Sequence, residues 1–266
     1  MKASQVLRIL FAAVLILTSL PVTSSADEEY HQSYHNFHIT GDAPEGTNGL
    51  WFNDETKTYT LESRPDGGFY NVTLSGQATG EGTYCNFVVA AKAKANITLD
   101  NVEIRIPSGA ASLTTAITVD RGSEVNIYLK GKNVLTSAKS AGLSIYGYAR
   151  IFEAEGGGSL YVSSSYHNAG IRVSMMYWNG IDYIGTLEIY GGSITAVGSQ
   201  EGAGIGGGAG ERVGDIWIHG GFINAIGHYG AGIGGGMIKS GGITVINGGI
   251  VNAVTSNEGG AGIGGG

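Results

Sequence analysis

The sequence has little proline, a single cysteine and few charged residues. Only 4 of its 266 residues are proline, so the 47 glycines do not belong to a collagen-like chain. The single cysteine, Cys85, excludes an internal disulfide, and its apolar surroundings at 85–89 predict a buried, unreactive thiol. Charged residues make up 14 % of the chain, which argues against solvated helices rich in Glu and Lys. A hydrophobic content of 42 % argues equally against disorder.

The glycines mark an internal repeat. The heptapeptide Gly-Ala-Gly-Ile-Gly-Gly-Gly occurs at 202–208, 230–236 and 260–266, and its isoleucines are 28 and 30 residues apart. Weaker upstream copies place four further apolar residues at the position of these isoleucines: Val88, Ile117, Leu143 and Ile171. The series comprises about seven units of 26–34 residues, which we interpret as one repetitive domain.

The unit predicts β-structure. Each repeat has three short segments of strand-like alternation and no amphipathic stretch of ten or more residues. Alignment of the last three units on their paired glycines gives columns of like residues: Ile189, Ile218 and Ile246; Ile194, Ile223 and Val251; Thr195, Asn224 and Asn252; Ala196, Ala225 and Ala253; and Ile205, Ile233 and Ile263. Such columns are typical of a parallel β-helix, whose turns stack about 4.8 Å apart. We therefore predict an all-β, single-stranded, right-handed parallel β-helix (a solenoid) of about seven turns.

The sequence divides into four regions. Residues 1–26 are typical of a secretory signal peptide, because Lys2 and Arg8 precede the apolar run 9–20 and small residues follow it. We expect residues 27–38 to be a mobile start of the mature chain. Residues 39–69 are expected to cap the β-helix, whose repeats occupy residues 70–266. Since the last repeat lacks an atypical capping segment, we expect a piece of a longer protein, or an edge covered by a partner or by self-association.

The charge balance restricts the partners. Without Lys2 and Arg8, 13 basic residues face 22 acidic ones, a net charge of −9. This balance disfavours nucleic acid and anionic membrane surfaces as partners. No second long hydrophobic run follows residues 9–20, so we predict no membrane insertion of the mature chain and a secreted, extracellular or cell-surface location.

No motif establishes metal or catalytic chemistry. The spacing Gly202-x-Gly204-x-x-Gly207 matches a dinucleotide-binding loop, but it recurs three times and opens no helix. Four acids of the early turns are weak candidates for a calcium site, although a solvated acidic face is the interpretation we favour: Asp100, Glu103, Asp120 and Glu124. Glu153 with Asp182 or Glu188 could form a carboxylate pair across turns. We therefore expect no cofactor, leave calcium open, and favour a protein without enzymatic activity.

Aromatic residues give the more specific hypothesis. The longest unit, of 34 residues, contains an insertion at 174–183 that is rich in aromatic side chains. Insertions in a solenoid form loops on one face, which is often the binding face. Aromatic rings can cover the C–H surface of sugars while polar neighbours bind their hydroxyls, although the same rings could instead pack the insertion onto the coil. The predicted carbohydrate-binding residues are Tyr177, Trp178, Tyr183, Tyr190, Trp217 and His219.

The runs 96–104, 116–119 and 125–135 resemble secreted, carbohydrate-binding, right-handed β-helix proteins of the pectate-lyase-like superfamily. The resemblance covers residues 70–266, and the glycine-rich repeats also resemble those of bacterial surface proteins. It implies polysaccharide binding, sometimes with calcium, and an ancestry shared with lyases that place acidic ligands beside a basic residue on one sheet. Arg150 and Arg172 lie in successive turns, but no acidic trio accompanies them, so no functional residue is assigned by motif.

These observations lead to three functional hypotheses. The first is a non-catalytic polysaccharide-binding module, secreted or at the cell surface, with the six aromatic and histidine residues named above as its contacts. The second is a structural or adhesive spacer of a larger surface protein, which the near-identical terminal repeats favour. The third is a polysaccharide lyase or glycoside hydrolase, in which Arg150 and Arg172 would be required.

Overall fold

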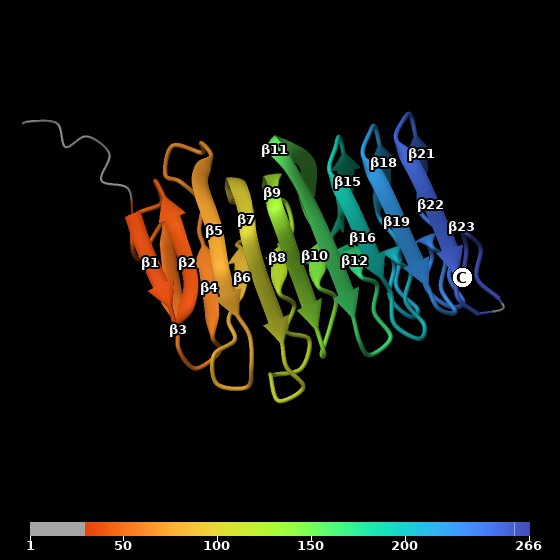
Figure 1. Cartoon of the computed structure of the whole chain (residues 1–266), viewed down its shortest axis with the longest axis horizontal. Coiled ribbons are helices and arrows are strands. Elements are labelled where there is room, and N and C mark those ends of the chain that lie inside the picture. The colour runs from red at the N-terminus through yellow and green to blue at the C-terminus, as the bar shows by residue number, and fades with distance from the viewer. Residues whose placement is uncertain (1–29, 258) are drawn as a thin grey trace, which may run out of the picture.

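The computed structural model describes residues 30–257 and 259–266, and the proposed signal peptide lies outside them. The described residues form 23 strands, and all but β13 and β14 belong to two sheets that run along one long axis (Figure 1). None of the described residues belongs to a helix long and apolar enough to cross a membrane. The prediction of an all-β parallel β-helix of about seven turns is therefore confirmed.

Two sheets form the walls of the solenoid, and a small hairpin lies outside them. The larger sheet has twelve strands: β1 (Tyr30–Tyr34), β2 (Asn36–Gly41), β5 (Tyr70–Ala78), β7 (Lys94–Ile106), β9 (Glu124–Ser137), β11 (Tyr148–Ser164), β15 (Thr186–Ile189), β16 (Ser193–Val197), β18 (Asp215–Ile218), β19 (Phe222–Gly227), β21 (Thr244–Ile246) and β22 (Ile250–Thr255). The smaller has nine: β3 (Leu50–Asn53), β4 (Thr58–Leu61), β6 (Asn86–Val89), β8 (Ile117–Val119), β10 (Leu143–Ile145), β12 (Ile171–Val173), β17 (Ile205–Gly206), β20 (Ile233–Gly234) and β23 (Ile263–Gly264). The hairpin pairs β13 (Met175–Trp178) with β14 (Ile181–Ile184).

The start of the described chain differs from our expectation. Residues 30–38, which we expected to be mobile, form β1 and the first half of β2. Strand β2 pairs with β5 in antiparallel orientation. The physical reason is burial of apolar side chains, since Phe37 and Ile39 are buried in the core at the end of the coil. The cap therefore begins before residue 39 and includes four strands, β1 to β4.

The columns aligned from sequence stack in register. Ile194 pairs with Ile223 and then with Val251, and the other four columns of the last three turns are likewise continuous. One upstream assignment is wrong by one residue. The column of Ile117 continues into Phe87 rather than Val88, because Phe87 is buried and Val88 points outward.

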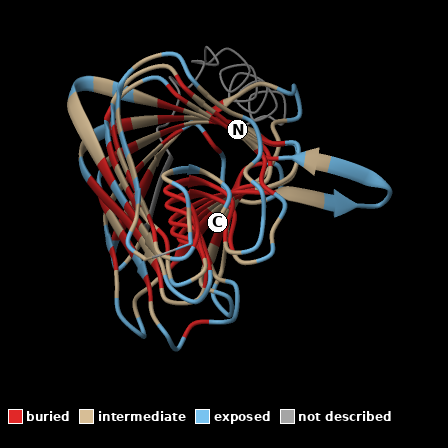
Figure 2. Cartoon of the chain, turned by 90° about the vertical axis from the view of Figure 1, so that its right-hand side faces the viewer, coloured by how far each residue is buried: buried red, intermediate tan, exposed pale blue. Residues whose placement is uncertain are grey.

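The strands that face the interior of the coil carry the buried residues (red in Figure 2). Ile, Leu, Val and Ala predominate among these residues. Glycine is required where the strands of the smaller sheet approach each other most closely. Gly206 has a φ of +138°, and a Cβ added there would lie 2.0 Å from the carbonyl oxygen of Gly234. Gly234 and Gly264 repeat this conformation, which explains the repeated glycines of the heptapeptide.

Candidate functional site

A continuous outward face runs along the first halves of the long strands of the larger sheet. We call it the ladder face and define it by two adjacent columns. The first column is Asn71, Asn96, Asn126, Arg150, Glu188 and Trp217, and the second is Thr73, Thr98, Tyr128, Phe152, Tyr190 and His219. These side chains point outward because they alternate with buried Val, Ile and Leu along each strand.

The second column contains a ladder of stacked rings. Tyr128 stacks on Phe152 at 5.3 Å between ring centroids, Phe152 on Tyr190 at 5.0 Å, and Tyr190 on His219 at 4.6 Å. The interplanar angles are 20°, 11° and 19°, so successive rings cover each other's faces. The spacing follows from the distance between adjacent strands. The ladder therefore presents ring edges and polar atoms to solvent.

The first column contains a chain of amide hydrogen bonds. The Nδ2 of Asn126 donates to Oδ1 of Asn96 at 2.8 Å, and the Nδ2 of Asn96 donates to Oδ1 of Asn71 at 2.9 Å. Asn71 in turn donates to Oδ2 of Asp42 at 2.7 Å. Each amide has two N–H groups and an oxygen with two lone pairs, so one donor and one acceptor site of each remain available.

A charged cluster follows the amides. Arg150 donates through Nη1 to Glu124 Oε1 at 3.0 Å and to Asn126 Oδ1 at 3.1 Å, and through Nε to the Tyr148 hydroxyl at 3.0 Å. Burial alone would lower the pKa of Arg150, but its hydrogen bonds to Tyr148 and Glu124 outweigh that effect and raise it. The guanidinium is thus held as a cation by three hydrogen bonds to neighbouring side chains.

Glu188 is the centre of the neighbouring carboxylate site. Its two carboxylate oxygens accept hydrogen bonds from the Tyr148 and Tyr190 hydroxyls, each at 2.5 Å, and His219 Nε2 lies 3.9 Å away. Burial opposes ionisation, but the two hydroxyl donors outweigh it, so the pKa of Glu188 lies below its usual value. The pKa of Tyr148 is raised, first by burial and then by its bond to Glu188.

The inserted residues form a hairpin that projects from the coil (Figure 2). Its tip is exposed, with Tyr177 71 % and Trp178 49 % accessible to solvent. The Trp178 ring lies over the guanidinium of Arg121, 4.6 Å from ring centroid to Cζ, which fixes the hairpin against the loop that follows β8, two turns earlier. Asp182 lies 3.7 Å from Arg212 on the other side.

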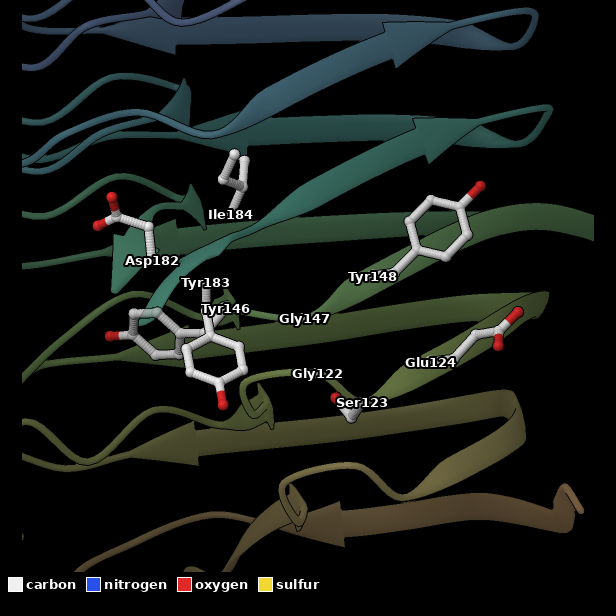
Figure 3. Close-up of a pocket in the computed structure, with 9 residues that line it drawn as sticks. All are labelled: Gly122, Ser123, Glu124, Tyr146, Gly147, Tyr148, Asp182, Tyr183 and Ile184. Atoms are coloured by element: carbon white, nitrogen blue, oxygen red, sulfur yellow. The ribbon is translucent and has the colours of Figure 1, made fainter. Parts of the chain in front are cut away.

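A pocket of about 320 Å³ lies between this hairpin and the ladder face (Figure 3). Tyr183, Asp182 and Ile184 line it from the hairpin, and Glu124 and Tyr148 line it from the ends of β9 and β11. Because Glu124 and Tyr148 also bond to Arg150 and Glu188, the pocket opens directly onto the charged cluster. The hairpin therefore forms one wall beside the ladder face.

The six predicted carbohydrate-binding residues fall into two groups. Tyr177, Trp178 and Tyr183 lie on the hairpin, and Tyr190, Trp217 and His219 lie on the ladder face. Both ring faces of Tyr190 are covered, by Phe152 and by His219, so sugar contacts from Tyr190 would use its edge and hydroxyl. Trp217, beside Glu188, has no stacked ring among the described residues. Sequence reasoning missed the amides, Tyr128 and Phe152, which belong to the less regular early turns.

The four acidic candidates for calcium are not brought together. Asp100 pairs with Lys130 at 2.9 Å, Asp120 with Arg121 at 3.2 Å, and Glu124 with Arg150 at 3.0 Å. Glu103 pairs with Arg105. No group of three or more His, Cys, Asp or Glu residues suited to a metal occurs among residues 30–257 and 259–266.

The other paired candidates are also separated. Arg172 lies on β12 of the smaller sheet, where it is buried and bonded to Ser144, Asn168 and Glu211, whereas Arg150 lies on the larger sheet. Glu153 turns toward the backbone of Gly158, at 3.4 Å, rather than toward Glu188. The structure therefore gives Arg172 a part in packing and leaves Arg150 as the basic residue of the ladder face.

The fold and the two columns of the ladder face define a parallel β-helix protein whose larger sheet presents polar and aromatic side chains outward. The comparisons with known proteins agree with this class. A family model described as a beta helix repeat matches residues 187–209, 216–237 and 245–266, which are the turns from β15 to β23. No curated protein and no solved structure matches the chain. The likeness to β-helix proteins is thus confirmed for the repeat, and the function has to be argued from the site.

Proposed function

We propose that this chain is an exported, non-catalytic module that binds polysaccharide along the ladder face. The observation that carries the proposal is the amide chain from Asn126 to Asn71, which offers unused donors and acceptors along the axis of the solenoid. Sugar hydroxyls are both donors and acceptors, so they match such a row. The hairpin beside it supplies two solvent-exposed aromatic side chains, Tyr177 and Trp178.

The charges on the face favour an uncharged glycan. The cations Lys94 and Arg150 are paired with Glu124, and the carboxylate of Glu188 is bonded to two tyrosines. No excess of positive charge is available to attract a polyanion. A polysaccharide of neutral sugars is therefore the partner that the face fits best.

Affinity electrophoresis of the chain without residues 1–26 tests the proposal. Neutral polysaccharides in the gel should retard it, and polygalacturonate should not. Tyr177→Ala should weaken the retardation, whereas Tyr166→Ala, which removes a ring that is 75 % exposed on a loop outside the site, should not. Unchanged mobility in every neutral gel would refute the proposal.

A second candidate is a structural or adhesive spacer, favoured by one observation. The last three turns repeat the same columns on both sheets, so the coil is a stiff rod of uniform cross-section there. The lyase or hydrolase alternative has less support, because Arg150 already donates to Glu124, Asn126 and Tyr148 and its raised pKa opposes a role as base. Release of unsaturated products from polyuronates would be the sign of a lyase.

A further inference from the structure

The ring ladder ends at Tyr128, and a pocket takes the place of the next ring. One face of Tyr128 is covered by Phe152. On its other side the same column continues with Thr98 and Thr73, whose short side chains cannot reach across the strand spacing to stack. A pocket of about 390 Å³ lies at this point.

The pocket is lined only by uncharged residues, among them Gly41, Asn71, Thr73, Asn96, Thr98 and Tyr128. Asn71 and Asn96 are members of the amide chain and bring their unused donors and acceptors to one side. Thr73 and Thr98 also line the pocket and bring a hydroxyl group each. The Tyr128 hydroxyl makes no hydrogen bond to the described residues, so it too is available to a ligand.

We propose that this pocket binds one pyranose unit of a neutral glycan, stacked on the open face of Tyr128 so that the sugar continues the ring ladder. The inference rests on the proposed function and names its main sugar-binding position. The C–H surface of the sugar covers the tyrosine face, and its hydroxyls bond to the amides of Asn71 and Asn96. A uronic acid is disfavoured, because none of the residues that line the pocket carries a positive charge to pair with its carboxylate.

A substitution that fills the pocket with a larger side chain of the protein itself provides the sharpest test. Thr98→Phe places a ring beside Tyr128 and should extend the ladder, so the variant should keep the thermal midpoint of the parent chain or raise it. Binding of cellohexaose, xylohexaose or mannohexaose, measured by calorimetry, should weaken by about tenfold or more. The matched control is Thr195→Phe, the same change at an outward position of β16 between Tyr161 and Asn224. It should bind like the parent chain.

A second substitution tests the proposal even if Thr98→Phe disturbs the fold around position 98. Tyr128→Leu retains bulk against Phe152 but removes the ring face, and it should show the same loss while Tyr128→Phe retains binding. If the parent chain binds a hexasaccharide and both Thr98→Phe and Tyr128→Leu bind it equally well, this inference is overturned and the proposed function stands. If the parent chain binds none of the neutral glycans, the proposed function fails and the inference fails with it.

Discussion

Arg150 and Asp42 are the two ends of one chain of side-chain hydrogen bonds that crosses four neighbouring strands. The guanidinium of Arg150 donates to Asn126, and the amides of Asn126, Asn96 and Asn71 each donate to the next, until Asp42 accepts the last bond. Every donor points the same way. A cation at one end and a carboxylate at the other fix this direction, so the amides present a constant pattern of free donors and acceptors.

Breaking the amide chain should affect both stability and binding. Asn96→Ala removes one hydrogen bond to Asn71 and one from Asn126, so we expect a loss of about 1–3 kcal/mol in the free energy of unfolding. Binding of neutral glycan should weaken as well, because the row of hydroxyl partners is interrupted. Urea unfolding and affinity electrophoresis measure the two effects.

The matched control for this change lies in the other amide ladder. Asn224 accepts a bond from Asn252 at 2.8 Å, on β19 and β22, away from the ladder face. Asn252→Ala removes this single bond, so its cost should be smaller, and glycan binding should be unchanged. Equal loss of binding in the two variants would contradict the assignment of the ladder face.

The sequence predicted the column that contains Asn224 and Asn252 but not the amide chain through Asn96, for a physical reason. The late turns have similar lengths and paired glycines at each corner, so their columns can be aligned by counting. The early turns have long strands whose register shifts near Asp100 and Glu153. On β11 the shift places extra residues between Phe152 and the glycines at 156–158, so counting back from the glycines does not align Phe152 with Tyr190. The same uncertainty explains the slip at Val88, since one residue of shift exchanges the two faces of a strand.

The sequence therefore predicted only part of the candidate site. Tyr190 and His219 are both among the residues predicted to contact sugar, and their rings do stack. Phe152 and Tyr128 complete the column of these rings, but the register shifts on their strands keep them out of a column counted from the glycines. Nothing in the sequence indicated that Thr98 would leave an opening beside Tyr128, because an opening depends on the side chains of three neighbouring strands at once.

The Glu188 cluster predicts a defined dependence of stability on pH. The pKa of Glu188 is lowered in the folded chain, so the unfolded chain takes up its proton first as the pH falls. The contribution is complete above the usual carboxyl value, near 4.5, and is lost as the pH falls through the lower folded value. Glu188→Gln should cost about 1–2 kcal/mol at pH 7, and this cost should shrink as the pH falls below about 4.5.

At alkaline pH the same cluster loses its contribution to stability as the pH rises. Hydrogen bonding to Glu188 raises the pKa of Tyr190 above its usual value of 10, and burial with the same partner raises that of Tyr148. Their contributions are complete below about pH 10 and are lost as the pH rises through the folded values. Urea unfolding across pH 3–11 measures the difference in the free energy of unfolding between the parent chain and Glu188→Gln. This difference should reach a plateau between the acidic and the alkaline limits. A difference that stays constant across both limits would show that these bonds do not stabilise the fold.

Truncation within one core column should show how stability depends on burial. Ile205 is fully buried, so Ile205→Ala should destabilise the coil by about 2–5 kcal/mol. Ile263 occupies the same column two turns later but is 48 % exposed, and Ile263→Ala should cost much less. Urea unfolding followed by circular dichroism compares them, and equal costs would contradict the stacking of this column.

Cys85 gives a probe of unfolding that needs no substitution. The thiol is fully buried, and burial raises its pKa far above the usual value, so almost no thiolate exists at pH 8. Ellman's reagent should therefore not react with the folded chain over hours and should modify one thiol per chain in urea. Because the unfolding that exposes Cys85 must separate the early turns, its labelling rate should rise in Asn96→Ala and stay unchanged in Ile263→Ala. Rapid labelling of the folded parent chain would show that the early turns open far more readily than their packing implies.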